Sequence, residues 1–421
     1  MDAFPKVVGL IQAKDDWPLL AFSVSHALLN HVDEVLLLNH GGNDAMSGGL
    51  AKLAGLWPGR LAVLDLDDPA FFQEAASSVL LEACQSSSPD WIYAFDADEF
   101  LLTRDRRPLK AVLRAVDPAH SAIRYQVQNW VSFQDFDDAA PEAYARLRFR
   151  SEPNLLCNAP PKALIAEIRS GARNYYDVPF GSKVILRNRK DVWLSAGAHD
   201  LKSVEQLSVL ETDCNDVRAA HFPLLSRDRL RLRAQQGERL AKDGFGISHG
   251  WQSHLIYDLW KEGELDGFWR RHALSINAAD LGDGAQPKVV EDEAFVRSIE
   301  PTLSLVKNEF GAAMIRDGQM SSPPVARRDS RIELRTAIRS VRRIQSVAEE
   351  KIASHERMSK QLAKARNRPI SVFWNLIYFR LLVFATRLRF LLSDRVRMRI
   401  AQSAQKRDPN RSLAATNSPP G

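Results

Sequence analysis

Residues 91–100 read WIYAFDADEF, and this stretch decides both the fold and the place of a site. An apolar run leads directly into Asp96, Asp98 and Glu99. Carboxylates this close together repel one another, so the arrangement requires a counter-charge. Alternate side chains of an extended strand point to the same face. We therefore predict that residues 90–100 form a strand whose end presents Asp96 and Asp98 to a common ligand.

The segments before this stretch alternate between short apolar runs, which are typical of buried strands, and apolar residues at helical spacing. We predict strands at residues 6–14, 33–40 and 60–68, and helices at 15–31 and 69–84. We expect Asp15 or Asp16 to cap the first helix, with Pro18 in its first turn, and residues 41–49 to form a loop. Such alternation predicts an α/β fold, in which a mostly parallel sheet is sandwiched by helices. The polar residues after each strand then meet at the carboxyl edge, where ligands of these sheets bind.

The charge of the chain is distributed unevenly. Of 57 Lys and Arg residues and 52 Asp and Glu residues, residues 321–421 hold 22 and 7, which leaves 35 and 45 for residues 1–320. An acidic body argues against nucleic acid as the main partner. The three cysteines are widely spaced, and the first residues lack the apolar core of a signal peptide. We therefore expect a cytoplasmic protein.

Three interpretations of the acidic stretch follow from the residues themselves. Two carboxylates suit Mg²⁺ or Mn²⁺ bound to a phosphate-bearing substrate, in which case the metal is the counter-charge. The carboxylates could also be a solvated strand end. A third possibility is a phosphatase of the haloacid dehalogenase type, with Asp96 as the nucleophile. That class usually has Thr or Val two residues after the second aspartate, where this chain has Phe100.

Several motifs resemble those of the family 2-like glycosyltransferases of GT-A fold. The resemblance is closest to a bacterial branch with the motifs Asn-His-Gly-x-x-Asp, here at residues 39–44, and Asp-x-Asp-Glu-Phe, here at 96–100. Residues 180–201 and 219–237 are similar to later, looser motifs of that branch. The resemblance covers about residues 5–260. It implies a nucleotide-diphospho-sugar transferase that uses Mn²⁺ or Mg²⁺.

The resemblance also implies roles for individual residues. Asp96 and Asp98 match the Asp-x-Asp pair that holds the metal and the sugar-nucleotide phosphates and ribose. His199 or His221 would supply a third metal ligand, and Lys183 would face the phosphates. The residues implied at the nucleoside are Asp15 or Asp16, Asn39, His40 and Asp44. Simpler interpretations remain open for several of these residues, since Lys183 could be an ordinary strand lysine and His221 a buried histidine bonded to a carbonyl.

The resulting prediction is metal-dependent transfer of a sugar from a nucleotide-sugar donor to a hydroxyl of a glycan or lipid-linked acceptor. The family resemblance implies inversion at the anomeric carbon. A carboxylate would act as general base, and Glu152 and Asp200 are the favoured candidates because each follows in a segment rich in possible site residues. The alternatives are the phosphatase and a non-catalytic nucleotide-sugar-binding or envelope-assembly protein.

The basic C-terminal part predicts a separate extension. We expect a GT-A-like domain at residues 1–316, a linker at 317–330, a basic helical extension at 331–395 and a disordered tail at 396–421. Residues 370–393 are apolar and aromatic but interrupted by arginines. This pattern favours an amphipathic helix on an anionic membrane surface, peripheral on the inner face, over a membrane-spanning helix. A buried or dimerising helix is the alternative.

Overall fold

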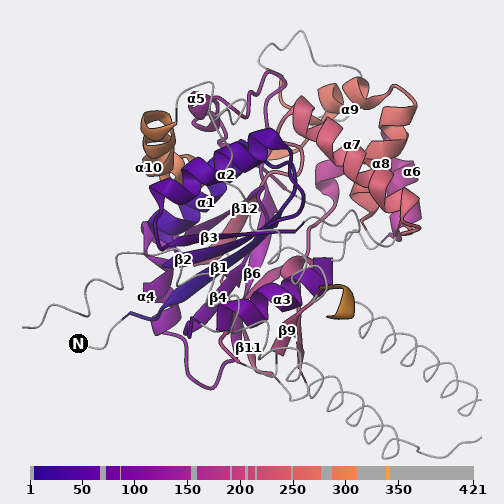
Figure 1. Cartoon of the computed structure of the whole chain (residues 1–421). Helices are drawn as coiled ribbons and strands as arrows, with labels where there is room; N and C mark the ends of the chain where they lie inside the picture. Colours follow the sequence, from indigo (N-terminus) through magenta and orange to yellow (C-terminus); the bar gives the residue numbers. More distant parts are fainter. Residues whose placement is uncertain are drawn as a thin grey trace, which may run out of the picture.

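A mixed, mostly parallel sheet with helices on both faces forms the body of the molecule (Figure 1), which confirms the predicted α/β class. The computed structural model describes residues 4–66, 73–85, 87–152, 159–189, 192–203, 207–213, 216–247, 250–275, 287–310 and 338–341. Everything stated below refers to these residues.

The main sheet has the strand order β3-β2-β1-β4-β8-β6-β12-β5, with β11 paired beside β6. The first four strands of this order are parallel, whereas β8 is antiparallel to both of its neighbours and β5 is antiparallel to β12. Its members are β1 (Val7–Ala13), β2 (Glu34–Asn39), β3 (Leu61–Asp65), β4 (Trp91–Ala94), β5 (Glu99–Thr103), β6 (Ala122–Asn129), β8 (Lys183–Arg187), β11 (Val209–Glu211) and β12 (Val217–His221). Two small antiparallel sheets join β7 (Phe149–Ser151) to β13 (Val289–Glu291) and β9 (Val192–Leu194) to β10 (Leu201–Ser203).

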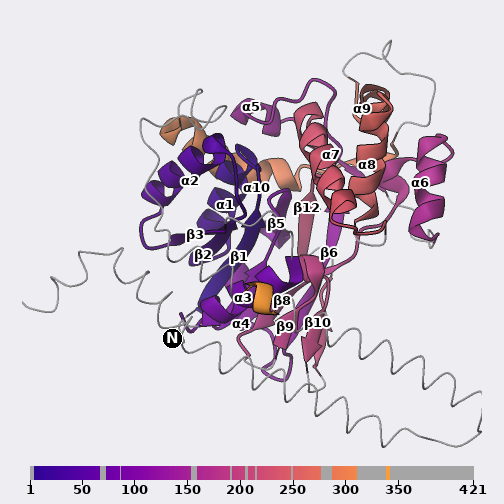
Figure 2. The same cartoon turned by 45° about the vertical axis from the view of Figure 1, so that its right-hand side comes forward.

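The helices fall into two groups around this sheet. One group covers its faces, and α6 to α9 gather beside the end at which β12 leads into α7 (Figures 1 and 2). The α-helices are α1 (Leu19–Asn30), α2 (Asp44–Leu56), α3 (Gln73–Gln85), α4 (Leu109–Arg114), α5 (Pro141–Tyr144), α6 (Pro161–Arg169), α7 (Arg227–Lys242), α8 (Trp251–Lys261), α9 (Leu265–His272) and α10 (Ala294–Glu309). The 3-10 turns are η1 (Arg104–Arg106), η2 (Tyr175–Asp177) and η3 (Ala196–Ala198).

Alternation along the central strands creates two separate cores. In β1, Val7 and Ile11 belong to the core beneath α1 and α10, whereas Val8 and Leu10 belong to the core beneath α3. Successive side chains of a strand point to opposite faces, so an apolar run supplies both layers at once. This is why the continuous apolar runs of the sequence correctly predicted buried strands.

The segment after β2 differs from the sequence prediction. Residues 41–49 were expected to form a loop, but α2 begins within them at Asp44. The side chain of Asn43 accepts a hydrogen bond from the Met46 amide and so caps the helix. The glycines of this segment concealed the helical pattern, because glycine disfavours helix interiors. The predicted cap of α1 is also wrong, since no side chain caps that helix and Pro18 occupies the capping position.

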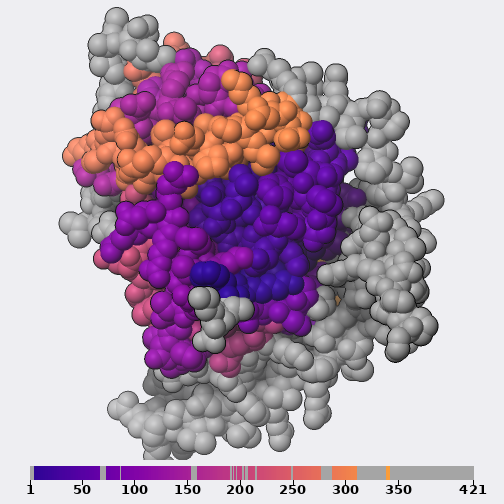
Figure 3. Space-filling model, turned by 90° about the vertical axis from the view of Figure 1, so that its left-hand side faces the viewer, coloured from indigo at the N-terminus to yellow at the C-terminus, as the bar shows by residue number. Residues whose placement is uncertain are grey.

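The last helix of the main body packs against the first one. Figure 3 shows the residues of α10, in orange, lying along the indigo and purple N-terminal residues. The rings of Trp17 and Phe310 are 5.8 Å apart between centroids, and those of Phe100 and Phe295 are 5.2 Å apart. Residues at both ends of the domain therefore share one core.

Most of the predicted extension lies outside the described residues. The linker at 317–330, the amphipathic segment at 370–393 and the tail at 396–421 are among these, so the predicted domain boundaries and membrane contact stay predictions. Residues 338–341 are described and are helical, and Ile338 is 2% exposed in the core beneath α3. Among the helices described, none combines the length and the apolar character that crossing a bilayer requires.

Replacing Ile338 by alanine tests whether the extension contributes to the core. Removing a buried isoleucine side chain should lower the free energy of unfolding by about 2–5 kcal/mol, measured by urea denaturation of the full chain. Ile247→Ala is the matched control, because Ile247 is 37% exposed and should change the value by no more than about 0.5 kcal/mol. Equal effects of the two substitutions would contradict the packing of Ile338.

Two buried histidines make stability depend on pH. The Nε2 atoms of His26 and His31 both donate to the Leu101 carbonyl, at 3.0 and 2.8 Å. Burial lowers the pKa of His26 to about 4 and the pKa of His31 to about 3. Unfolded histidine titrates near pH 6.5, so below that pH the unfolded chain binds protons that the folded chain does not. Each histidine then removes about 1.4 kcal/mol of stability per pH unit, and removes none above pH 6.5.

His31→Gln should remove the contribution of His31 to the slope of the unfolding free energy against pH. Glutamine keeps a donor for the Leu101 carbonyl but does not titrate. Between pH 6 and pH 5 the slope of unfolding free energy against pH, from urea denaturation, should be about 1.4 kcal/mol per unit smaller in the variant than in the wild type. Identical slopes would show that His31 does not stay neutral in the folded state.

Candidate functional site

The acidic stretch is a turn rather than the end of one strand. β4 ends at Ala94 and β5 begins at Glu99, so Asp96 and Asp98 lie in the connection between them. β4 pairs with β1 and β8, whereas β5 pairs with β12. The prediction of a single strand over residues 90–100 is therefore wrong. Because the chain turns here, the carboxylates of this acidic turn (Asp96, Asp98 and Glu99) do not all face the same way.

Lys183 pairs with two of the three carboxylates. It is the first residue of β8, and its Nζ lies 2.7 Å from Asp96 Oδ2 and 2.7 Å from Glu99 Oε2. The side chains of Lys183 and Glu99 are 2% and 3% exposed, whereas that of Asp96 is 45% exposed. Burial alone would lower the pKa of Lys183, but attraction to Asp96 and Glu99 outweighs it and raises the pKa. Lys183 is thus a permanent positive charge, not an ordinary strand lysine.

Asp98 contacts an arginine and a histidine of later elements. Its Oδ2 lies 3.0 Å from Arg233 Nη2 and 3.7 Å from His221 Nε2. Burial alone would raise the pKa of Asp98, but attraction to His221 and Arg233 lowers it overall. The ring of His221 is fixed by Asn129 Oδ1, 2.8 Å from Nδ1, and by the ring of Phe180, 4.7 Å away between centroids. His221 is therefore oriented toward the acidic turn from the last residue of β12.

The end of β1 contributes a second pair of carboxylates. Asp15 accepts a hydrogen bond from the Asn43 amide at 3.0 Å, and its backbone has a positive φ of 55°. Asp16 accepts one from the Lys14 amide at 2.9 Å and pairs with Arg229 of α7. These contacts hold both side chains at the carboxyl edge of the parallel strands. Residues after β1, β2 and β4 thus meet at this edge, as predicted, whereas Asp65 at the end of β3 and Asp44 do not join them.

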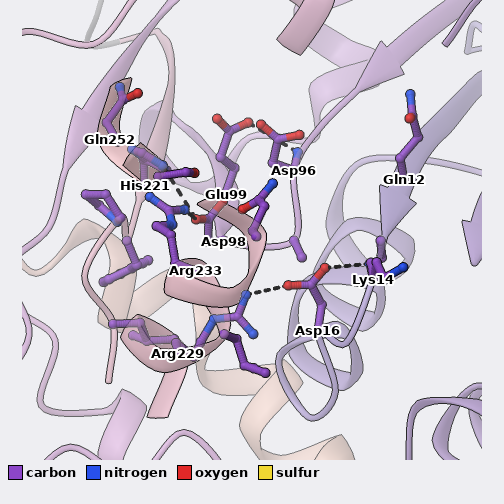
Figure 4. Close-up of a pocket in the computed structure, with 18 of the residues that line it drawn as sticks. Gln12, Lys14, Asp16, Asp96, Asp98, Glu99, His221, Arg229, Arg233 and Gln252 are labelled. Carbon is purple, nitrogen blue, oxygen red and sulfur yellow. Dashed lines mark hydrogen bonds and ion pairs between the residues drawn. The ribbon is translucent and has the colours of Figure 1, made fainter. Parts of the chain in front are cut away.

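These residues line one cavity of about 330 Å³. Among the described residues, five carboxylates and five lysine or arginine side chains face it, so their formal charges balance. Figure 4 shows Asp16 directed toward Arg229, and Asp98 directed toward His221 and Arg233. The charged and histidine residues of the lining are Lys14, Asp15, Asp16, His40, Asp96, Asp98, Glu99, Lys183, His199, His221, Arg229, Arg233 and Arg239.

Four predicted site residues lie elsewhere. Asn39 donates to Asp65 Oδ1 at 3.0 Å and accepts from the Gly42 amide at 3.0 Å, so it shapes the loop after β2. Asp44 is the first residue of α2. The favoured general bases are also outside the cavity lining: Glu152 is exposed after β7, and Asp200 is 66% exposed and pairs with Arg124.

The ring of His199 lines the cavity and packs closely against two glycines, Gly181 and Gly197. A Cβ on Gly181 would lie 3.0 Å from the ring, and one on Gly197, where φ is +68°, would lie 2.9 Å from it. The small residues before His199 therefore permit close approach, as the sequence indicated. Its Nδ1 lies 3.0 Å from the Ser182 carbonyl, and burial lowers the pKa of the ring.

Sequence reasoning missed the arginines of α7. Arg229, Arg233 and Arg239 all line the cavity, together with Gln236. Residues 229, 233 and 236 follow the spacing of one helix face, which could have indicated a common target. α8 packs closely behind this helix, because a Cβ on Gly237 would lie 2.1 Å from the Ser253 carbonyl. The polar pattern of the segment predicted the helix but not which of its faces would line the cavity.

The predicted metal ligands do not fit a divalent cation as they are arranged. Lys183 and Arg233 already bind the two aspartates of the acidic turn. Among the described residues, no three His, Cys, Asp or Glu side chains form a group that could hold one ion. A cation between the aspartates would meet two positive charges at short range. The counter-charge that the sequence required comes here from side chains.

Comparisons with known proteins add no family assignment. No family model and no curated protein matches the chain. The crystal structure of S. aureus TarS 1–349 is similar over 80% of this chain and 91% of that chain, at 10% sequence identity and a TM-score of 0.30. The crystal structure of the same protein in complex with UDP covers the same shares, at 12% sequence identity and a TM-score of 0.28. Glucosyl-3-phosphoglycerate synthase from Mycobacterium tuberculosis, in complex with Mn²⁺, UDP and phosphoglyceric acid, is similar over 57% and 80%, at 12% and 0.26. These similarities assign neither a family nor an activity to this chain.

Replacing Lys183 by methionine should destabilise the fold. The substitution leaves Glu99 buried without a counter-charge, which should cost about 3–5 kcal/mol of unfolding free energy in urea at pH 7. Adding Glu99→Gln should restore most of that loss, because glutamine is neutral. Lys110→Met is the control, since Lys110 pairs with Asp33 at the surface and should cost about 1 kcal/mol or less. Equal costs at the two lysines would contradict a buried ionic anchor.

Proposed function

We propose that this chain is a glycosyltransferase that moves a sugar from a nucleotide-sugar donor to a hydroxyl group of a glycan or lipid-linked acceptor, with inversion at the anomeric carbon. One observation carries the proposal. Most of the residues that the motif resemblance assigns to the nucleoside, the phosphates and the metal line one cavity, although they come from different strands. They come from the end of β1, the acidic turn, the start of β8 and the end of β12.

The charges of the cavity suit a diphosphate leaving group. In the proposed step, an acceptor oxygen forms a bond to the anomeric carbon as the bond from that carbon to the phosphate oxygen breaks. The electron pair leaves with the diphosphate, whose growing negative charge must be stabilised. Lys183 and the arginines of α7 are positive groups fixed around the cavity before the substrate arrives. Preorganised charges of this kind cost no reorganisation during the reaction.

Asp96 is the carboxylate that we assign to the proton of the acceptor. Inversion requires a group that takes this proton as the new bond forms. The side chain of Asp96 is 45% exposed, against 21% for Asp16, 17% for Asp15, 10% for Asp98 and 3% for Glu99. Asp96 is thus the most accessible carboxylate of the lining, whereas Glu152 and Asp200 lie outside it.

The predicted need for Mn²⁺ or Mg²⁺ stays a prediction. The cavity offers no ready ligand set, so the proposed step uses only side chains. Association with a membrane surface likewise stays a prediction, since residues 370–393 lie outside the described part of the chain.

Asp96→Asn tests the assignment. With UDP- and GDP-sugars as donors, release of the nucleoside diphosphate should fall about 100-fold or more, since removing a general base typically costs 10²–10⁴ in rate. Nucleotide binding, followed by thermal shift, should persist. Asp90→Asn is the matched control, because Asp90 is exposed immediately before the start of β4 and should leave release unchanged.

Two outcomes would contradict the proposal. One is full nucleotide release by the Asp96→Asn variant, which would exclude Asp96 as the base. The other is hydrolysis of p-nitrophenyl phosphate by the wild type without any binding of nucleotides, which would support the phosphatase alternative instead.

A further inference from the structure

One face of α7 concentrates positive charge on the cavity. Arg229, Arg233 and Arg239 point toward it, and Gln236 completes the row. Figure 4 shows Arg229 and Arg233 reaching the carboxylates opposite them. The other arginines of the helix do not line the cavity, and Arg231, for example, is exposed and pairs with Asp228. We refer to Arg229, Arg233 and Arg239 as the arginine face.

Each member of the arginine face is paired with a carboxylate of the proposed donor site. Arg229 binds Asp16, Arg233 lies 3.0 Å from Asp98, and Arg239 lies 3.9 Å from Asp15. These contacts join α7 to the end of β1 and to the acidic turn. The carboxylates thus occupy the guanidinium groups that an incoming anion would need.

The three pairs differ in how readily they can exchange partners. The side chain of Arg229 is 15% exposed, whereas those of Arg233 and Arg239 are 24% and 37% exposed. The contact between Arg239 and Asp15 is also the longest of the three. An anion in the cavity can therefore reach Arg233 and Arg239 most easily, with Arg229 as a fixed anchor.

We infer that the arginine face binds the diphosphate of the donor directly, with Arg233 and Arg239 exchanging their aspartates for phosphate oxygens and no divalent cation between them. This inference rests on the proposed function. A planar guanidinium group forms two parallel hydrogen bonds to a phosphate, which suits a diphosphate better than a single point charge does. Since Lys183 and Arg233 already pair with the carboxylates of the acidic turn, a divalent cation would have to displace an ammonium or a guanidinium group to bind there.

Binding of inorganic pyrophosphate in the presence of EDTA provides the test. Isothermal titration of the full chain should show binding, and Arg233→Gln and Arg239→Gln should each weaken it about 10-fold or more, as expected for the loss of a charge-assisted contact. Arg231→Gln is the matched control, because it removes the same charge from the same helix outside the cavity. It should leave the affinity unchanged.

Asp98→Asn distinguishes direct binding by the arginine face from binding through a metal, because the two predict opposite changes in the affinity for pyrophosphate. Without the carboxylate, Arg233 is released, so pyrophosphate in EDTA should bind as tightly as to the wild type or more tightly. If a metal held by Asp98 carried the diphosphate, the wild type would bind only with Mn²⁺ and Asp98→Asn would abolish that binding. Either of those two results would overturn the inference.

Folding of the variants is checked by thermal denaturation. Arg233→Gln leaves Asp98 with fewer partners, so Arg233→Lys, which keeps the charge but loses the planar pair of donors, serves as the second variant. It should bind pyrophosphate more weakly than the wild type while melting at a similar temperature. The inference would be contradicted if Arg233→Lys and Arg239→Gln, as two separate variants, both bound pyrophosphate with wild-type affinity.

Failure of the inference and failure of the proposed function give different results. Binding of pyrophosphate that depends on the arginine face, without release of nucleotide from any sugar donor, would support the anion site and count against transfer. Nucleotide release that requires Mn²⁺ and is unaffected by Arg233→Lys would support transfer and overturn the inference.

Discussion

Ion pairs between the acidic turn and basic side chains of later elements hold together parts of the chain that are far apart in sequence. Glu99 and Lys183 are 84 residues apart, and Asp98 and Arg233 are 135 apart. Without these partners the turn would place buried carboxylates beside one another, at a large cost in free energy. With them, the connection from β4 to β5 becomes the point at which the parallel strands, β8, β12 and α7 meet. The fold and the cavity thus share one set of contacts.

This arrangement gives the cavity an unusual balance. Carboxylates and basic side chains face it in equal number among the described residues, and most of them are paired with each other. On the proposed function, a polyanionic ligand would not enter an empty positive pocket here. It would compete for guanidinium groups that already pair with carboxylates, so its binding free energy would be the difference between those of two sets of ion pairs. Such competition favours ligands with several oxygens in fixed geometry, since a single weak acid gains little from the exchange.

The strands and the edge that carries the site could be predicted from the sequence because both follow from local patterns. Apolar runs in β1, β2, β3 and β4 predicted the parallel block, and polar residues after them predicted its ligand-binding edge. The break at Asp96–Glu99 could not be predicted, because it depends on the pairing of β5 with β12 far along the chain. The partners of the carboxylates were missed for the same reason. Arg233 looks like any surface arginine until the direction of α7 is known, and Glu152 and Asp200 had only their sequence neighbourhood to favour them.

The distance along the chain between the acidic turn and its partners has a consequence for synthesis on the ribosome. Strands β1 to β4 emerge first and can pair at once, since their partners are neighbours. The carboxylates of the acidic turn, at the carboxyl edge of these strands, must wait longer for their partners. Lys183 is made only when the chain is about twice as long as at the end of β4, and Arg233 is made later still. During this interval the nascent sheet carries a negatively charged edge that water must solvate. Release of that water as α7 arrives would close the cavity late in synthesis, before the last helix, α10, packs against α1.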